Sequence, residues 1–180
     1  MVIHSLAVFC GSHNGSDPLY TAHAKQLGKL MAENNIALIY GGGSVGIMGT
    51  IADTVMSHGG KVIGIIPQVL VEWERQHKNI TELIVTEDMH IRKKTIYSMC
   101  DAGVILPGGF GTLDELFEML TWNQLSIHDK EIFIINTGGF YNHLIAHINK
   151  MQEEKFLYEI AAQRINVLNS PEDILPFINR

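Results

Sequence analysis

The sequence has little cysteine, little positive charge and no long hydrophobic run, and each shortage argues against a class of protein. Its two cysteines, Cys10 and Cys100, provide neither a disulfide framework nor the paired spacing of a metal site, so we expect two buried free thiols. Lysine and arginine number 13 against 19 aspartates and glutamates, and the net charge of −6 argues against a nucleic-acid-binding surface. No apolar stretch approaches the length of a membrane span, and residues 1–6 lack the features of a secretory signal. We therefore expect a cytoplasmic protein with neither nucleic acid nor membrane as a partner.

Hydrophobic residues are plentiful, and their arrangement predicts the fold. They make up 46% of the 180 residues, which suffices for one sizeable core, and we find no repeat or linker that divides the chain. Short apolar runs alternate with longer helical patterns, as in a parallel sheet covered on both faces. We predict a single α/β domain over residues 1–180, a Rossmann-like, doubly wound parallel sheet flanked by helices. The predicted strands lie near residues 5–10, 36–40, 61–66, 82–86, 102–106, 131–135 and 165–168.

The first of two glycine-rich turns, Gly41–Gly46 (GGGSVG), follows a predicted strand and precedes a predicted helix. It satisfies the spacing of the dinucleotide fingerprint, yet the next strand ends in residues 64–67 (GIIP), without the acidic residue that would hold a ribose hydroxyl. Ile47 also stands where a Walker loop carries its lysine. The turn is then either a phosphate-sized nest of backbone N–H groups or a structural tight turn.

The second turn lies within residues 107–115 (PGGFGTLDE) and joins the predicted strand 102–106 to a helix. Glycines let the backbone approach a ligand closely, and a helix N-terminus attracts an anion. We expect Glu115 in the first turn of this helix, where the helix dipole favours an ionised carboxylate. Such a group can position sugar hydroxyls, activate water or stabilise a developing cation. The stretch therefore indicates a site for a phosphorylated sugar.

Basic and histidine side chains also gather on predicted helices. Arg92, Lys93 and Lys94 form a compact basic cluster on a helix over residues 88–99, and by itself such a cluster is usually a solvated helix face. His143 and His147 lie one helical turn apart, but the glutamate of the zinc hydrolase motif is missing between them and no third ligand follows. We expect two partly exposed histidines, no metal site and no cofactor.

These motifs together resemble those of one family. Residues 107–115 resemble the PGGxGTxxE signature of the Lonely Guy family of cytokinin riboside 5'-monophosphate phosphoribohydrolases. Three further segments, Tyr40–Gly49, Met89–Lys93 and Thr121–Leu125, are similar to the family's other motifs and stand in the same order. The resemblance covers roughly residues 5–160. Phe110 and Asp114 depart from the commonest residues of the signature, both at variable positions.

The resemblance implies an enzyme that hydrolyses the N-glycosidic bond of a purine nucleoside 5'-monophosphate and releases the free base and ribose 5-phosphate. It implies Arg92 and Glu115 as catalytic residues, and a homodimer with its sites near the subunit boundary. The base is adenine or an N6-modified adenine, and the sequence leaves this choice open. The substrate-binding residues that the resemblance implies are Gly42, Gly43, Ser44, Glu74, Lys93, Gly108, Gly109, Phe110, Gly111, Thr112, Leu113, Asp114 and Thr121.

Another class of function fits the same fold. Carriers of the molybdenum cofactor resemble this family, so a non-catalytic carrier or sensor of a nucleotide or of that cofactor is the alternative. Glu115 and Arg92 favour the enzyme, because a carrier has no use for a carboxylate at a scissile bond. Some relatives bear a lysine decarboxylase label, which we discount because no lysine here stands in a recognisable context for binding pyridoxal phosphate.

Overall fold

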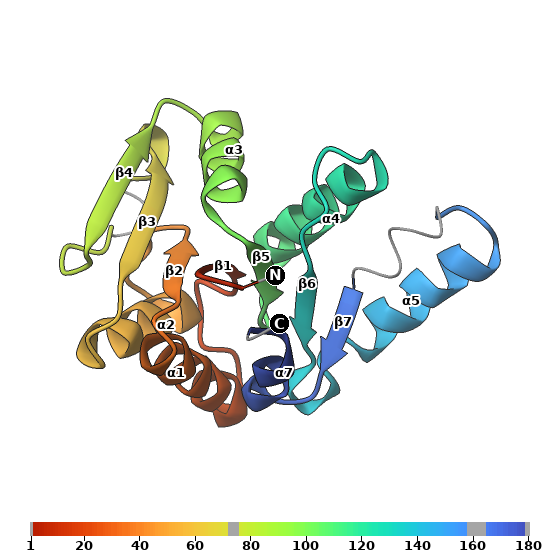
Figure 1. Cartoon of the computed structure of the whole chain (residues 1–180), viewed down its shortest axis with the longest axis horizontal. Helices are drawn as coiled ribbons and strands as arrows, with labels where there is room; N and C mark the ends of the chain where they lie inside the picture. The colour runs from red at the N-terminus through yellow and green to blue at the C-terminus, as the bar shows by residue number, and fades with distance from the viewer. Residues whose placement is uncertain (1, 72–75, 158–164, 179–180) are drawn as a thin grey trace.

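The computed structural model describes residues 2–71, 76–157 and 165–178, which are built around one seven-stranded sheet (Figure 1). Neighbouring strands are parallel throughout, in the order β4-β3-β2-β1-β5-β6-β7. The predicted class, a doubly wound parallel sheet flanked by helices, is confirmed, and every predicted strand is found. The strands are β1 (Ser5–Phe9), β2 (Ala37–Tyr40), β3 (Val62–Pro67), β4 (Glu82–Thr86), β5 (Ala102–Ile105), β6 (Ile132–Ile135) and β7 (Ile165–Leu168).

Helices cover both faces of this sheet (Figure 1). One core cluster joins the sheet to α1, α2 and the C-terminal turns, and a second joins its other face to α3, α4 and α5. The helices are α1 (Pro18–Glu33), α2 (Gly46–Ser57), η1 (Gln68–Leu70), α3 (Met89–Met99), α4 (Phe110–Gln124), η2 (Thr137–Gly139), α5 (Asn142–Glu153), η3 (Pro171–Ile174) and α7 (Leu175–Ile178). In the described part of the chain, no helix combines the length and the hydropathy needed to cross a bilayer.

Three strands inside the sheet are apolar along their whole length because helices cover both of their faces. Every residue of β3 (VIGIIP), β5 (AGVI) and β6 (IFII) is buried. By contrast, the edge strand β4 (ELIVT) buries only its last residue fully, and Glu82 begins it at the surface. This is the pattern expected of a parallel sheet, in which side-chain burial follows position in the sheet rather than strict alternation.

The strand order places one crevice at the centre of the sheet. The chain proceeds from β1 outward to β4 on one side and then returns to β5 on the other side of β1. Ligands of open α/β sheets bind beyond the carboxyl ends of the strands at such a switch point. Here the turns that follow β1, β2 and β5 contain Gly11, Gly41 and Pro107, so both predicted glycine-rich turns reach this crevice.

Asp101 fastens the start of β1 to the segment that leads into β5. Its Oδ2 atom accepts hydrogen bonds from the backbone N–H groups of His4 (2.8 Å) and Ser5 (2.9 Å) and from the Ser5 hydroxyl (3.0 Å). Asp101→Ala should lower the free energy of unfolding by about 1–3 kcal/mol, because partly buried donors then lose their acceptor. Urea unfolding measures the change.

Glu87→Ala is the matched control for this experiment. Glu87 is an exposed carboxylate ahead of α3, and its removal should change stability by no more than about 0.5 kcal/mol. If Asp101→Ala proved as neutral as this control, water would be an adequate replacement for the carboxylate and the proposed fastening would be wrong.

Candidate active site

The turn after β5 leads directly into the first residues of α4. Gly109 is the N-cap of α4 and supplies no side-chain cap, so the first N–H groups of the helix are left for another acceptor. Gly108 packs tightly, because a Cβ atom there would overlap the Thr112 side chain and come within 2.8 Å of the Gly11 nitrogen. On the outer side, Gly109 and Gly111 face open space and Phe110 is 94% exposed. The turn therefore presents bare backbone and one aromatic ring to solvent.

Backbone hydrogen bonds join the turns at the switch point into one unit. The Gly11 N–H donates to the Pro107 carbonyl at 3.0 Å, and the Met48 N–H of α2 donates to the Gly11 carbonyl at 3.3 Å. Helix α2, like α4, opens without a side-chain cap, at Val45. Two uncapped helix N-termini thus converge on the turn after β1, an arrangement that favours an anionic ligand.

Arg92 and Glu115 form a buried ion pair next to these turns. Arg92 Nη1 lies 3.3 Å from Glu115 Oε1, and the side chains are only 8% and 11% exposed. Arg92 Nε also donates to the Ile65 carbonyl at 3.0 Å, and its Nη2 atom lies where a side chain at Gly41 would begin. Because a buried charge is costly without a partner, each group compensates the charge of the other and holds it in place. Arg92 is therefore not part of a solvated helix face.

The position predicted for Glu115 within its helix is wrong. Helix α4 begins at Phe110, so Glu115 stands five residues further on, in the second turn, and the first turn contains no acidic residue. The field of the helix N-terminus weakens beyond the first turn, and it is the Arg92 guanidinium that faces the carboxylate instead. The prediction failed because the glycine-rich residues Phe110–Thr112 are themselves the first turn of α4, which the motif does not reveal.

Lys93 and Asp114, both predicted to bind substrate, are paired with each other. Lys93 Nζ lies 2.7 Å from Asp114 Oδ2 and 3.4 Å from Glu118 Oε2. Burial lowers the pKa of Lys93, but the hydrogen bond to Asp114 and the two carboxylate charges outweigh it, so the pKa is raised overall. Lys93 is thus a permanent cation that links α3 to α4, while Lys94 is exposed, as expected.

Other predicted residues surround this centre at different depths. Gly42, Gly43 and Thr112 are buried, and Ser44 and Leu113 are partly buried. Thr121 lies elsewhere, eleven residues beyond Phe110 and therefore about 16 Å along α4. Its exposed hydroxyl donates to the Phe117 carbonyl at 2.7 Å. Glu74, also predicted, lies outside the described residues.

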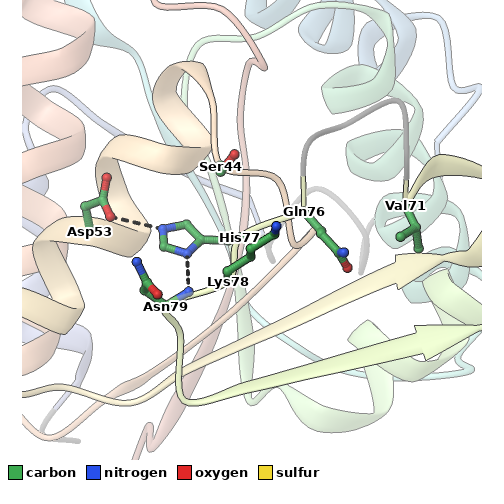
Figure 2. Close-up of a pocket in the computed structure, with 7 residues that line it drawn as sticks. All are labelled: Ser44, Asp53, Val71, Gln76, His77, Lys78 and Asn79. Atoms are coloured by element: carbon green, nitrogen blue, oxygen red, sulfur yellow. Dashed lines mark hydrogen bonds and ion pairs between the residues drawn. The ribbon is translucent and has the colours of Figure 1, made fainter.

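Two cavities open beside the glycine-rich turns. One, of about 290 Å³, lies between the Gly11–Ser12 turn and Pro107–Gly109 and is flanked by Tyr20 and Phe140, whose rings meet edge to face at 5.6 Å. The other, of about 610 Å³, is drawn in Figure 2. Its lining residues are Ser44, Asp53, Val71, Gln76, His77, Lys78 and Asn79. Sequence reasoning missed His77 and Asp53, because no motif relates two residues on separate elements.

The thiols and the remaining candidate side chains take no visible part in this site. Cys10 and Cys100 are free and buried, as expected. Burial raises the pKa of the Cys10 thiol, and the negative charge of Glu115 raises it further, so Cys10 stays protonated. His143 and His147 are exposed, and the described residues contain no cluster of three or more His, Cys, Asp or Glu side chains suited to a metal. The rings of Trp122 and Tyr97 pack edge to face with their centroids 4.9 Å apart, as core aromatic residues do.

Solved structures that resemble this fold are only distantly related in sequence. The molybdenum cofactor binding protein from Rippkaea orientalis matches with a TM-score of 0.73 at 22% identity, over 99% of this chain and 96% of the other. The Moco carrier protein from Chlamydomonas reinhardtii matches with a TM-score of 0.70 at 20% identity, over 97% and 94% of the two chains. At such identities the likeness establishes the fold and not the function.

Sequence comparisons reach much closer relatives. A family model described as "possible lysine decarboxylase" matches residues 48–178. The probable cytokinin riboside 5'-monophosphate phosphoribohydrolase LOGL6 of Oryza sativa subsp. japonica is 42% identical over 170 residues, which cover 94% of this chain and 68% of the rice protein. The cytokinin riboside 5'-monophosphate phosphoribohydrolase LOG7 of Arabidopsis thaliana is 43% identical over 160 residues, 89% and 74% of the two chains. The chain therefore belongs to the Lonely Guy family of cytokinin riboside 5'-monophosphate phosphoribohydrolases.

Proposed function

We propose that the protein hydrolyses the N-glycosidic bond of purine nucleoside 5'-monophosphates, with adenine or an N6-modified adenine as the base, and releases the base and ribose 5-phosphate. The observation that carries the proposal is the buried Arg92–Glu115 pair at the meeting point of two glycine-rich turns. Relatives that are 42% and 43% identical are named for this reaction, whereas the carriers of the molybdenum cofactor share only the fold. This difference favours hydrolysis over the carrier function.

The chemistry needs a negative charge beside the sugar. As the base departs, positive charge develops at C1′ and the ring oxygen, and an ionised carboxylate nearby stabilises it. Arg92 orients the carboxylate of Glu115, and this carboxylate stabilises the cation and orients the attacking water. Water then bonds to C1′ through its oxygen, and the proton that the water loses ends on the departing base.

Phosphate binding positions this reaction. The N–H groups at the start of α4, with Gly108–Thr112, and the first glycine-rich turn, with Gly42, Gly43 and Ser44, are the proposed cradle for the 5'-phosphate. Contacts to the phosphate, which does not react, hold C1′ against Glu115 and so reduce the barrier. Phe110 is the proposed stacking partner of the base because it stands exposed within the same turn.

We further propose that the protein is a cytoplasmic homodimer with the sites near the boundary between subunits. Thr121 is too far along α4 to reach a ligand bound at the N-terminus of the same helix. In the proposed dimer, it contacts the substrate that is bound by the other subunit. Beside it, a groove of about 300 Å³ is lined by apolar side chains, among them Phe117, Met151 and Phe156. Phe156 is 77% exposed and Phe117 is 37% exposed, which suits a surface that a second copy covers.

The first prediction about function concerns the catalytic pair. Glu115→Gln preserves the shape of the side chain but removes its charge, so kcat for AMP should fall roughly 10²–10⁴-fold while the protein stays folded. Liquid chromatography of the released adenine measures turnover, and circular dichroism checks folding. Glu87→Gln, a substitution at an exposed site, is the control and should have the kcat of the wild-type protein. Near-normal turnover by the Glu115 variant would exclude this residue from the mechanism.

Arg92→Ala should also lower turnover strongly, and it tests the pairing from the other side. It leaves Glu115 buried without its guanidinium, so Arg92→Lys accompanies it as a variant that keeps the charge but not the planar fork. We expect Arg92→Ala to lose at least as much turnover as Glu115→Gln, and Arg92→Lys to recover only part of it. Unchanged kinetics in both variants would make Arg92 a purely structural residue.

The second prediction concerns the substrate's phosphate. The 5'-monophosphate should be cleaved far better than the corresponding nucleoside, with a loss for the nucleoside in kcat as well as in apparent affinity, because the phosphate contacts position the sugar. AMP, isopentenyladenosine monophosphate and their nucleosides form the matched substrate set. If a nucleoside were an equal or better substrate, both glycine-rich turns would be structural only.

The third prediction concerns the dimer. Light scattering should give a mass in solution that is twice the 20.1 kDa of one chain. Phe117→Glu places a charge in the groove beside Thr121 and should dissociate the dimer, while Val85→Glu, at an exposed position on the edge strand β4, should not. A wild-type protein that is monomeric at micromolar concentration would contradict the proposal.

A further inference from the structure

A short segment lies along the first glycine-rich turn and is bonded to it. The His77 N–H donates to the Gly42 carbonyl at 2.9 Å, and Gln76 forms an antiparallel bridge with Gly43. Gly42 has a φ of 81°, a backbone conformation that side chains disfavour. Residues 76 and 77 thus pair with the turn as a strand would and support it in this conformation.

The side chain of His77 holds this segment against helix α2. His77 is only 5% exposed, and its Nε2 atom lies 3.0 Å from Asp53 Oδ1 on α2 (Figure 2). Its Nδ1 atom accepts a hydrogen bond from the Asn79 N–H at 3.2 Å. Since Nδ1 is an acceptor, the proton of the neutral ring lies on Nε2 and points to Asp53.

These hydrogen bonds also exclude a catalytic triad of serine, histidine and aspartate at this place. Ser44, His77 and Asp53 line one cavity, which brings together the residue types of a hydrolytic triad (Figure 2). A triad histidine must accept the serine proton on the nitrogen that does not face the carboxylate. Here that nitrogen, Nδ1, is already used by Asn79, so His77 is not a base for Ser44.

We propose that His77 and Asp53 are positioning residues for the phosphate of the substrate, which rests on the function proposed above. They hold Gly42 and Gly43 in place through the segment at 76–77. The same turn carries Gly41, against which the Arg92 guanidinium lies, so a displaced turn shifts the phosphate cradle relative to the Arg92–Glu115 pair. Misplacement by about 1 Å far from the reacting atoms can cost 10²-fold in rate.

The exposure of Asp53 separates this role from a purely structural one. The Asp53 side chain is 71% exposed, and water competes for its hydrogen bond with His77, so this bond contributes little to stability. Loss of the contact with Asp53 should therefore lower kcat/KM clearly and change the free energy of unfolding only a little. His77→Asn retains an acceptor for the Asn79 N–H but is too short to reach Asp53, whereas His77→Gln retains a donor toward Asp53.

The test compares His77→Asn, His77→Gln and Asp53→Ala in the full-length protein, with His147→Asn at an exposed site on α5 as the control. We expect His77→Asn and Asp53→Ala to lower kcat/KM for AMP by roughly 10–100-fold, His77→Gln to recover part of it, and the double variant His77→Asn/Asp53→Ala to be no worse than either single one. Residual hydrolysis of adenosine should not change, because adenosine lacks the phosphate. Thermal unfolding temperatures complete the comparison.

Binding of ribose 5-phosphate, measured by calorimetry, separates the two proposals. Weaker binding by His77→Asn and Asp53→Ala supports the positioning role even if AMP proves not to be the substrate. Wild-type binding of ribose 5-phosphate and unchanged kcat/KM in these variants, or equal losses for AMP and adenosine, would overturn it.

Discussion

The ion pair between Arg92 and Glu115 is the constraint on which the rest of the site depends. Neither charge tolerates burial alone, so α3 and α4 must be packed closely enough to bring the two side chains to 3.3 Å. The carbonyl of Ile65 in β3 and the bare backbone of Gly41 complete the surroundings of the guanidinium. The contacts of one side chain, Arg92, thereby fix two helices, the strand β3 and a glycine-rich turn relative to one another. The salt bridges of Lys93 add a second link between the same helices at the surface.

The fold could be predicted almost completely because its signals are local. Buried runs such as those of β3 and β6 are apolar from end to end, and α4 begins at Phe110, within the glycine-rich turn that indicated a helix start. What failed was the position of Glu115, which lies in the second turn of α4 and not in the first. Glu115 is paired with Arg92, which lies on another helix, and no local sequence pattern predicts which side chains of two helices will pair.

The candidate site could be predicted only as far as motifs reach. Arg92 and Lys93 are neighbours in one motif, yet one is buried beside Glu115 and the other bridges two carboxylates near the surface. Burial depends on the direction in which each side chain leaves α3, which sequence spacing alone does not determine for a helix without a strongly apolar face. His77 and Asp53 escaped notice for a related reason, since their contact joins residues 24 positions apart on different elements.

The strand order also determines when the site comes into existence during synthesis. β1 is paired with β2 on one side and with β5 on the other, and the contact of Ser5 with Asp101 spans 96 positions of the chain. A growing chain that has emerged from the ribosome only as far as β4 already contains the first glycine-rich turn, but it has neither Arg92 nor Glu115. Since α4 is made last of these parts, Glu115 becomes available only after β1 to β5 and α3 have been made. The ion pair, and with it the proposed catalytic pair, therefore forms only when α4 packs against α3.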